Sequence, residues 1–188
     1  MSSLISFTGN LVKMKTKLNT LLSKRTNENK NEIDAEIWRL YGEKRAIVFV
    51  DLTKFTRKTK KFGIIASLSV INKINEMVKS MSKRHKGTLV KFLGDGCLVT
   101  FHEVDDAIRF SDSMMSESKK QNTKISIGIG FGEVIELEGL DIFGAEVNHT
   151  FAVEKIAVPM QIIITKLAYE STSMKDKFKQ KGDHFIAI

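Results

Sequence analysis

Cysteine and long apolar runs are scarce in this chain. Its only cysteine is Cys97, which excludes a disulfide framework within the chain and fits a reducing compartment. No apolar run approaches the roughly 18 residues that a membrane-spanning helix needs. The short apolar patch in Met1–Val12 is broken by Gly9 and Asn10, unlike the core of a signal peptide. We therefore expect a cytoplasmic chain without a transmembrane segment.

Aromatic residues are sparse where positive charge is dense. Two basic runs contribute to the formal net charge of +8, one between residues 13 and 30 and one between residues 54 and 61. Neither run has the regularly interleaved aromatic side chains typical of single-stranded nucleic-acid binding, so we expect no specific nucleic-acid partner. The runs either form a solvated surface or contact a polyanion or acidic lipid. The histidines are scattered without the spacing of metal ligands.

The sequence predicts that residues 1–43 form a helical arm, which is followed by a single domain at residues 44–188. Apolar residues in Ser6–Ser23 recur at helical spacing, and Glu32–Tyr41 has a second apolar stripe that Gly42 can end. The length of 188 residues suits one domain with an appendage, and the apolar fraction of 42% is enough for a core. The arm is interpreted as a coiled-coil or signal-transmitting segment, or as helices that pack against the domain.

Two carboxylates stand at strand ends of the predicted sheet. Gly87–Phe101 has the pattern of strand, tight turn and strand, and the glycines around Asp95 permit the turn that holds this residue at its tip. The apolar run that ends in Asp51 is typical of a buried central strand. Two such carboxylates near one rim of a sheet can bind hard divalent cations, which favour a phosphate substrate. The alternative is that both aspartates only form turns.

The order of the predicted elements is that of a ferredoxin-like α+β fold. The pattern β-α-β-β-α-β places helices on one face of an antiparallel-rich sheet, and dimerisation is one way to cover the other face. One side of the strand Lys124–Phe131 carries Ser126, Gly128 and Gly130, so another backbone or a ligand can approach it closely. Besides Arg45–Asp51 and the hairpin, we expect helices at Gly63–Lys83, Glu103–Lys119 and Ala145–Ala157, and strands at Gln161–Thr165 and His184–Ile188.

Four motifs, in this order, resemble the class III adenylate/guanylate cyclase catalytic domain. They are VFVDLTKFT (48–56), GTLVKFLGDGCLVTF (87–101), ISIGIGFGEV (125–134) and LDIFGAEVN (140–148). The resemblance covers residues 44–188. It implies a nucleotide cyclase domain that converts a nucleoside triphosphate into a cyclic nucleotide and pyrophosphate. It also implies a head-to-tail homodimer whose interface sites each hold two divalent metal ions, Mg²⁺ or Mn²⁺.

The resemblance assigns one half of the composite site to metal binding. Asp51 and Asp95 match the two metal-binding aspartates of the family, and the backbone carbonyl of Leu52 would assist them. The other subunit would complete the site with residues that bind the nucleotide.

The nucleotide-binding half follows from the same resemblance. Lys91 and Asp141 match the pair that recognises adenine, which implies ATP rather than GTP as the substrate. Asn148 matches the asparagine that orients the ribose, although an asparagine near a helix start can also simply cap the helix. Lys181, or the nearby Lys179, is the candidate for a lysine that contacts phosphate.

One position departs from the family pattern. The family carries an arginine four residues after the asparagine, where it stabilises the transition state, but this chain has Ala152. Lys155 lies on the same helix stripe as Asn148 and Ala152 and is the candidate substitute. Slow adenylate cyclase activity is therefore one expectation. The alternative is a catalytically impaired homologue that binds ATP as a regulatory subunit, or as a heterodimer subunit whose partner supplies the arginine.

Overall fold

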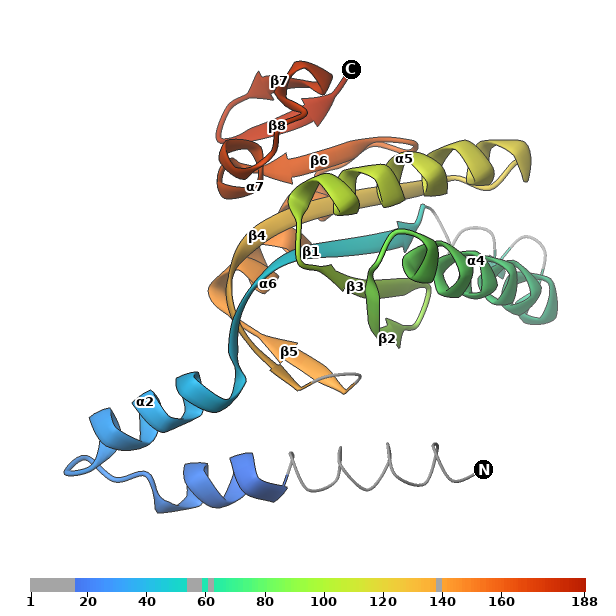
Figure 1. The fold of residues 1–188 in the computed structure, drawn as a ribbon. Helices are drawn as coiled ribbons and strands as arrows, with labels where there is room; N and C mark the ends of the chain where they lie inside the picture. Colours follow the sequence, from blue (N-terminus) through green and yellow to red (C-terminus); the bar gives the residue numbers. More distant parts are fainter. Residues whose placement is uncertain (1–15, 54–58, 61–62, 138–139) are drawn as a thin grey trace.

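An eight-stranded sheet organises the chain in the computed structural model, which describes residues 16–53, 59–60, 63–137 and 140–188. The strands lie in the order β2-β3-β1-β4-β6-β8-β7, and β5 pairs with β4 beside this path (Figure 1). The strands are β1 (Gly42–Leu52), β2 (Thr88–Leu93), β3 (Gly96–Phe101), β4 (Ile125–Leu137), β5 (Asp141–Phe143), β6 (Ile162–Thr165), β7 (Phe178–Lys181) and β8 (His184–Ala187). The helices are α2 (Lys30–Tyr41), α4 (Ile64–Arg84), α5 (Val104–Lys120), α6 (Ala145–Lys155) and α7 (Lys166–Ser171), with a 3-10 turn at Lys175–Lys177.

The segment from β1 to β4 forms the predicted ferredoxin-like unit. Its strands lie in the order β2-β3-β1-β4 with antiparallel pairing throughout. Helices α4 and α5 pack on one face of this sheet, where Val48 and Ile129 join Ile108 and Phe110 in one buried cluster (Figure 1). The α+β fold class is confirmed. Strand β4 continues to Leu137, beyond its predicted end, and it also pairs in parallel with β6.

Helix α6 lies on the opposite face of the sheet. Its Val147 and Phe151 pack against Ile47 and Phe49 of β1, and the rings of Phe49 and Phe151 lie 4.3 Å apart between centroids. The expectation that helices cover one face therefore holds for α4 and α5, whereas α6 covers part of the face that dimerisation was expected to protect.

The glycines of β4 explain how α6 comes so close to the sheet. A Cβ atom at Gly130 would lie 2.1 Å from Thr150 Oγ1, and a Cβ atom at Gly128 would lie 2.6 Å from the Thr150 carbonyl oxygen. A Cβ atom does not come this close to a non-bonded atom, so only glycine permits this packing. The backbone that the bare side of β4 was predicted to admit is that of α6.

The arm packs on the end of the sheet that carries β5. Residues 16–24 form a helix, and the remainder of the stretch predicted as helix lies outside the described residues. Leu18 and Leu21 from this helix meet Ile37 and Tyr41 of α2 and Leu137 of β4 in a separate buried cluster. Helix α2 then passes directly into β1 (Figure 1). Of the helices that the structure describes, none is both long and apolar enough to cross a membrane.

Candidate active site

Two strand-end aspartates meet at one end of the central strands. Asp51 is the penultimate residue of β1, and its cross-strand partner in β3 is Gly96. Asp95 sits in the turn before β3, where Gly94 adopts a φ of +63°. The Leu52 amide donates a hydrogen bond of 3.3 Å to the Asp95 carbonyl oxygen, which ties the turn to the end of β1. Both carboxylates are half-buried.

A third carboxylate, Glu154 of α6, faces the same place. Ser126 of β4 is the cross-strand partner of Asp51, and its hydroxyl donates a hydrogen bond of 2.6 Å to Glu154 Oε1. Sequence reasoning missed Glu154, because a charged residue on a helix is normally expected at the surface. The one available signal was the side of β4 that carries Ser126, Gly128 and Gly130. A helix that packs there places its inner side chains against glycines and a serine.

The electrostatics of this cluster favour a bound cation. The pKa of Asp51 is raised to about 7, first by burial and then by the charges of Glu154 and Asp95. Burial also raises the pKa of Glu154, against the lowering effects of the Ser126 hydrogen bond and Lys155. Carboxylates forced together in this way are relieved when a divalent cation neutralises them.

The donor set fits a hard cation such as Mg²⁺ or Mn²⁺. Asp51, Asp95 and the backbone at Leu52 offer oxygen ligands, and Mg²⁺ sites typically combine one or two carboxylates with water and substrate phosphates. Within the described residues, no group of three or more acidic, histidine or cysteine side chains has the geometry of a complete metal site. The Thr53 hydroxyl is buried and lacks a hydrogen-bond partner among these residues, so a polar ligand beside Asp51 would satisfy it.

The predicted base-recognition pair is assembled within one chain. Lys91 Nζ of β2 lies 2.6 Å from Asp141 Oδ1 of β5, and each side chain is about one-third exposed. The Ile142 amide also donates to Asp141 Oδ1, at 2.9 Å, which fixes the carboxylate. The pair therefore presents an ammonium and the other carboxylate oxygen of Asp141, to which no described residue donates, toward an accessible surface.

The outer face of α6 carries the remaining predicted residues. Asn148, Ala152 and Lys155 are all exposed and lie on one stripe of the helix. Asn148 is not a helix cap, because α6 begins at Ala145 and its cap position is Gly144. The capping alternative is therefore wrong. Ala152 places only a methyl group between Asn148 and Lys155.

The C-terminal lysines lie apart from these groups. Lys179 and Lys181 are exposed on β7, which is the last strand at the sheet edge opposite β2. Within the described part of the chain, no ion pair joins either lysine to the aspartates of the site. A role for Lys181 in phosphate contact stays a prediction.

A match to a protein-family model shows which family the chain belongs to. The model of the adenylate and guanylate cyclase catalytic domain matches residues 41–187. The chain belongs to this cyclase family. The cyclase domain is also 25% identical, over 119 residues, to the uncharacterized protein Rv2212 of Mycobacterium tuberculosis; the match covers 62% of this chain and 31% of that protein. The chain thus spans less than a third of the curated relatives it matches.

Solved cyclase structures share the fold of this cyclase domain. The monomeric guanylyl cyclase domain of the RhoGC fusion protein from the fungus Blastocladiella emersonii is 20% identical with a TM-score of 0.69, covering 79% of this chain and 95% of that one. The adenylyl cyclase CyaB from P. aeruginosa is 21% identical with a TM-score of 0.67, covering 78% and 94%. Because both guanylyl and adenylyl cyclases are among these structures, the shared fold leaves the choice between ATP and GTP to the site residues.

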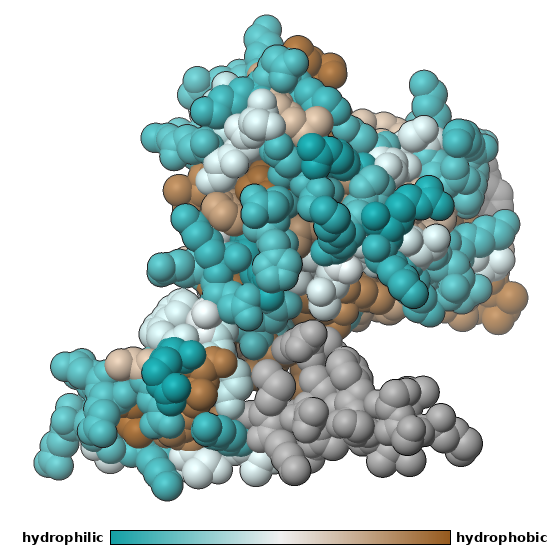
Figure 2. All heavy atoms as spheres, in the orientation of Figure 1, coloured by the Kyte–Doolittle hydropathy of each residue, from teal (hydrophilic) through white to brown (hydrophobic). Residues whose placement is uncertain are grey.

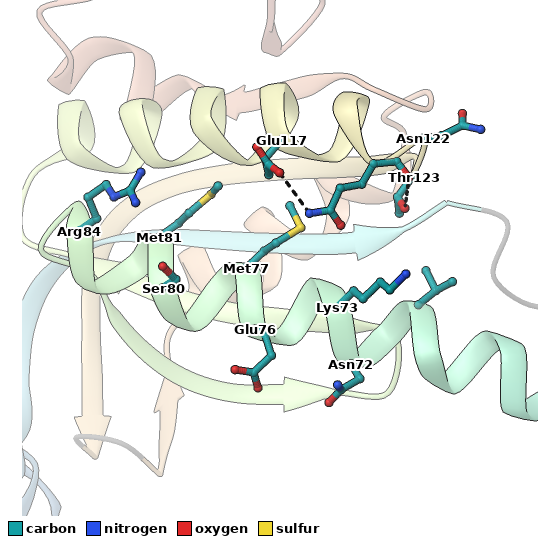
Figure 3. A pocket seen from close by; sticks show the side chains of 12 residues that line it. Asn72, Lys73, Glu76, Met77, Ser80, Met81, Arg84, Glu117, Asn122 and Thr123 are labelled. Atoms are coloured by element: carbon teal, nitrogen blue, oxygen red, sulfur yellow. Dashed lines mark hydrogen bonds between the residues drawn. The ribbon is translucent and has the colours of Figure 1, made fainter.

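The cyclase domain also has a groove that is separate from this site. It lies between α4 and α5, has a volume of about 920 Å³ and is lined by Lys73, Met77, Met81 and Glu117, among others (Figure 3). Gln121 also lines the groove and donates a hydrogen bond of 3.2 Å to Glu117 Oε1. The groove contains none of the predicted site residues and lies on the face of the sheet opposite α6.

Proposed function

We propose that the cyclase domain converts ATP to 3′,5′-cyclic AMP and pyrophosphate. The observation that carries this proposal is the convergence of Asp51 and Asp95 at the end of β1, supported by the preformed Lys91–Asp141 pair. In this reaction the ribose 3′-oxygen bonds to the α-phosphorus, the bond from that phosphorus to pyrophosphate breaks, and the 3′-hydroxyl proton is released. Two bound Mg²⁺ or Mn²⁺ ions would lower the pKa of that hydroxyl and neutralise phosphate charge.

The chain's own residues would position the nucleotide for this step. The Lys91 ammonium can donate to a ring nitrogen of adenine, and the free oxygen of Asp141 can accept from the exocyclic amino group. Asn148 can hydrogen-bond the ribose and hold its 3′-oxygen near the α-phosphorus, which reduces the entropic cost of reaction. Asp51 and Asp95, with the Leu52 carbonyl, would hold the metal ions, and Lys181 would contact phosphate.

We propose further that the active form is a head-to-tail homodimer with two composite sites. The exposed α6 stripe faces away from its own sheet, so its Asn148 is available to a second subunit. The first turns of α4 expose Ile64, Ile65 and Leu68, of which Ile65 is 76% exposed. This apolar surface lies at the end of α4 that follows the Asp51 strand (Figure 2) and would be covered in such a dimer.

The function is tested by turnover of the purified full chain with Mn²⁺ or Mg²⁺ and either ATP or GTP. We expect cyclic AMP from ATP at a higher kcat/KM than cyclic GMP from GTP. Equal or preferred use of GTP would contradict the adenine role of Lys91 and Asp141. If neither cyclic AMP nor cyclic GMP forms although ATP binds tightly, the chain is better explained as a catalytically impaired, ATP-binding homologue.

Complementation between inactive variants is expected if the sites are composite. Asp95→Ala removes a metal ligand and Lys91→Ala removes a base contact, so each homodimer should lose nearly all activity. In a mixed dimer, one site carries both changes while the other is intact. Mixing the two variants in equal amounts should therefore restore about a quarter of the parental rate. Mixtures no more active than the separate variants would contradict the shared site; a mixture of Asp95→Ala with Asp51→Ala is the matched control and should stay inactive.

The second candidate function is that of an ATP-binding regulatory or heterodimer subunit. Ala152 is the observation that favours it, because the exposed α6 stripe lacks an arginine between Asn148 and Lys155. A cation that acts mainly as charge develops in the transition state affects rate more than binding. A site without it would bind ATP well and turn it over slowly, unless a partner chain supplied the arginine.

Substitution of Ala152 distinguishes these possibilities. We expect Ala152→Arg to raise kcat about ten- to a hundredfold with little change in KM, since it restores transition-state stabilisation. If Lys155 already supplies this charge, Lys155→Ala is instead the damaging change and Ala152→Arg has little effect. Cyclic AMP production by both variants and by Ala152→Gln, a control of similar polarity without charge, gives the answer. A fast parental rate that neither substitution alters would contradict both roles.

A further inference from the structure

Two buried glutamates anchor the inner face of α6 to the sheet. Glu146 and Glu154 are each 5% exposed. Glu146 Oε1 accepts a hydrogen bond of 2.5 Å from Thr165 Oγ1, and Glu154 Oε1 accepts one of 2.6 Å from Ser126 Oγ. They are eight positions apart in the sequence, or about 12 Å along a helix axis. The two residues thus share a helix, a degree of burial and a type of hydrogen bond, but they occupy different ends of α6.

The two ends differ in the charges nearby. Glu154 lies at the end of α6 where its hydrogen-bond partner Ser126 is also the cross-strand partner of Asp51, so its carboxylate lies beside that aspartate. Burial raises the pKa of Glu154, and the charge of Asp95 acts in the same direction. Glu146 lies about two helical turns away, against Gly130 and Gly132 of β4. Its Oε1 instead also accepts a hydrogen bond from the Phe131 amide, at 3.3 Å, away from the aspartates.

Helix anchoring accounts for Glu146 but not fully for Glu154. A buried carboxylate is costly unless hydrogen bonds or an opposite charge compensate it. A glutamate placed beside two further carboxylates increases that cost, and a neutral side chain would anchor α6 through Ser126 equally well. A divalent cation at the aspartates would turn this repulsion into attraction.

We propose that Glu154 is a positioning residue of the cation site, whose negative charge behind Asp51 and Asp95 raises the affinity of these aspartates for divalent cations. It acts through its charge and not as a ligand, because the described residues hold no three-carboxylate group with metal-binding geometry. The inference rests on the proposed function, since it takes Asp51 and Asp95 as the metal ligands.

Mn²⁺ binding to the purified full chain, without nucleotide at pH 8, tests this role. Electron paramagnetic resonance of free Mn²⁺ gives the dissociation constant directly and does not depend on turnover. Glu154→Gln keeps the side-chain shape and an oxygen that accepts from Ser126 but removes the charge. We expect its Kd for Mn²⁺ to rise about tenfold, because the attraction between the Glu154 carboxylate and the bound cation is lost. Glu146→Gln is the matched control and should stay within about twofold of the parent.

The outcomes separate this inference from the function on which it rests. If Glu154→Gln binds Mn²⁺ as tightly as the parent, Glu154 is only an anchor and the inference is wrong, while the metal site stands. If Glu154→Gln and Glu146→Gln weaken Mn²⁺ binding equally, the packing of α6 and not the charge of Glu154 sets the affinity. This result also contradicts the inference. If the parent itself binds no Mn²⁺, the metal site and the inference fall together. Glu154→Asp, which keeps the charge, should retain affinity better than Glu154→Gln even if both variants lose stability.

Discussion

Asp51→Asn is expected to abolish metal-dependent turnover and, at the same time, to stabilise the metal-free protein above neutral pH. Loss of a carboxylate ligand should lower kcat/KM by about 10³-fold or more, because neither the cation nor the reacting phosphate is then held in position. The side chain lies at a strand end and is half-buried, so its exchange for an isosteric amide leaves the core intact.

The stabilisation follows from the direction of the pKa shift. The pKa of Asp51 is raised from 3.8 to about 7 in the folded chain, first by burial and then by Glu154 and Asp95. The folded state therefore binds this proton more tightly than the unfolded state. The resulting stability is fully present below pH 4 and is lost as the pH rises through about 7. The difference corresponds to at most ~4 kcal/mol, which solvent screening of a half-buried group reduces to about 1–2 kcal/mol.

Urea unfolding at pH 5 and pH 8 without metal checks this expectation. The parent should be more stable at pH 5, and Asp51→Asn should remove much of that difference. Asp105→Asn is a control of opposite sign: burial favours the neutral Asp105, but hydrogen bonds from Ser173 and Thr172 outweigh it and lower its pKa. Its substitution should destabilise the protein at pH 8. A parent that is more stable at pH 8 than at pH 5 without metal would contradict the electrostatic account of the site.

Gly130→Ala is expected to cause a large loss of stability, because it adds a methyl group against the inner face of α6. The new Cβ atom would lie 2.1 Å from Thr150 Oγ1 and 2.9 Å from Glu146 Oε1, so both of these buried side chains must shift. Overpacking of this kind typically costs about 1–3 kcal/mol, and the displaced hydrogen bonds of Thr150 and Glu146 add to it. We expect a loss of about 3 kcal/mol and a fall in activity, because α6 also carries Asn148.

A graded series isolates the steric cause. At Gly132 the nearest atom to a new Cβ would be Glu146 Cβ at 3.0 Å, so Gly132→Ala should cost clearly less than Gly130→Ala. Thr150→Ala removes the closest obstacle, and the double variant Gly130→Ala/Thr150→Ala should recover part of the loss in a double-mutant cycle. Equal losses at Gly130 and Gly132, or no recovery in the double variant, would show that α6 packing is not what these glycines protect.

The sequence order of the first four strands and the positions of the two aspartates could be predicted, because both depend on local signals. The short strands β5 and β7 were not predicted. A tight turn between two apolar runs specifies the hairpin and places Asp95 at its tip. An uninterrupted apolar run specifies the central strand that ends in Asp51. These signals involve neighbours in sequence, and the structure agrees with them.

The position of α6 could not be predicted in the same way. The helix buries Glu146, Thr150 and Glu154, together with Val147, and therefore has no clear apolar stripe to indicate which side faces the sheet. The contribution of Glu154 depends on Ser126 and Asp51, which are distant in sequence, so it becomes visible only once the strands are in register. The periodicity of apolar residues does not show which polar side chains are buried by segments distant in the sequence.

The packing of the arm has a consequence for how the chain can be shortened. Leu137 and Leu140, at the turn that connects β4 to β5, are covered by the helix at residues 16–24 and by α2. Asp141 follows directly after Leu140 and is paired with Leu137. Truncation before β1 would leave these leucines bare and loosen the strand that holds the carboxylate partner of Lys91, while Asp51 and Asp95 at the far end of β1 would keep their support. A fragment trimmed in this way should therefore lose selectivity between nucleotides, and solubility, before it loses its affinity for divalent cations.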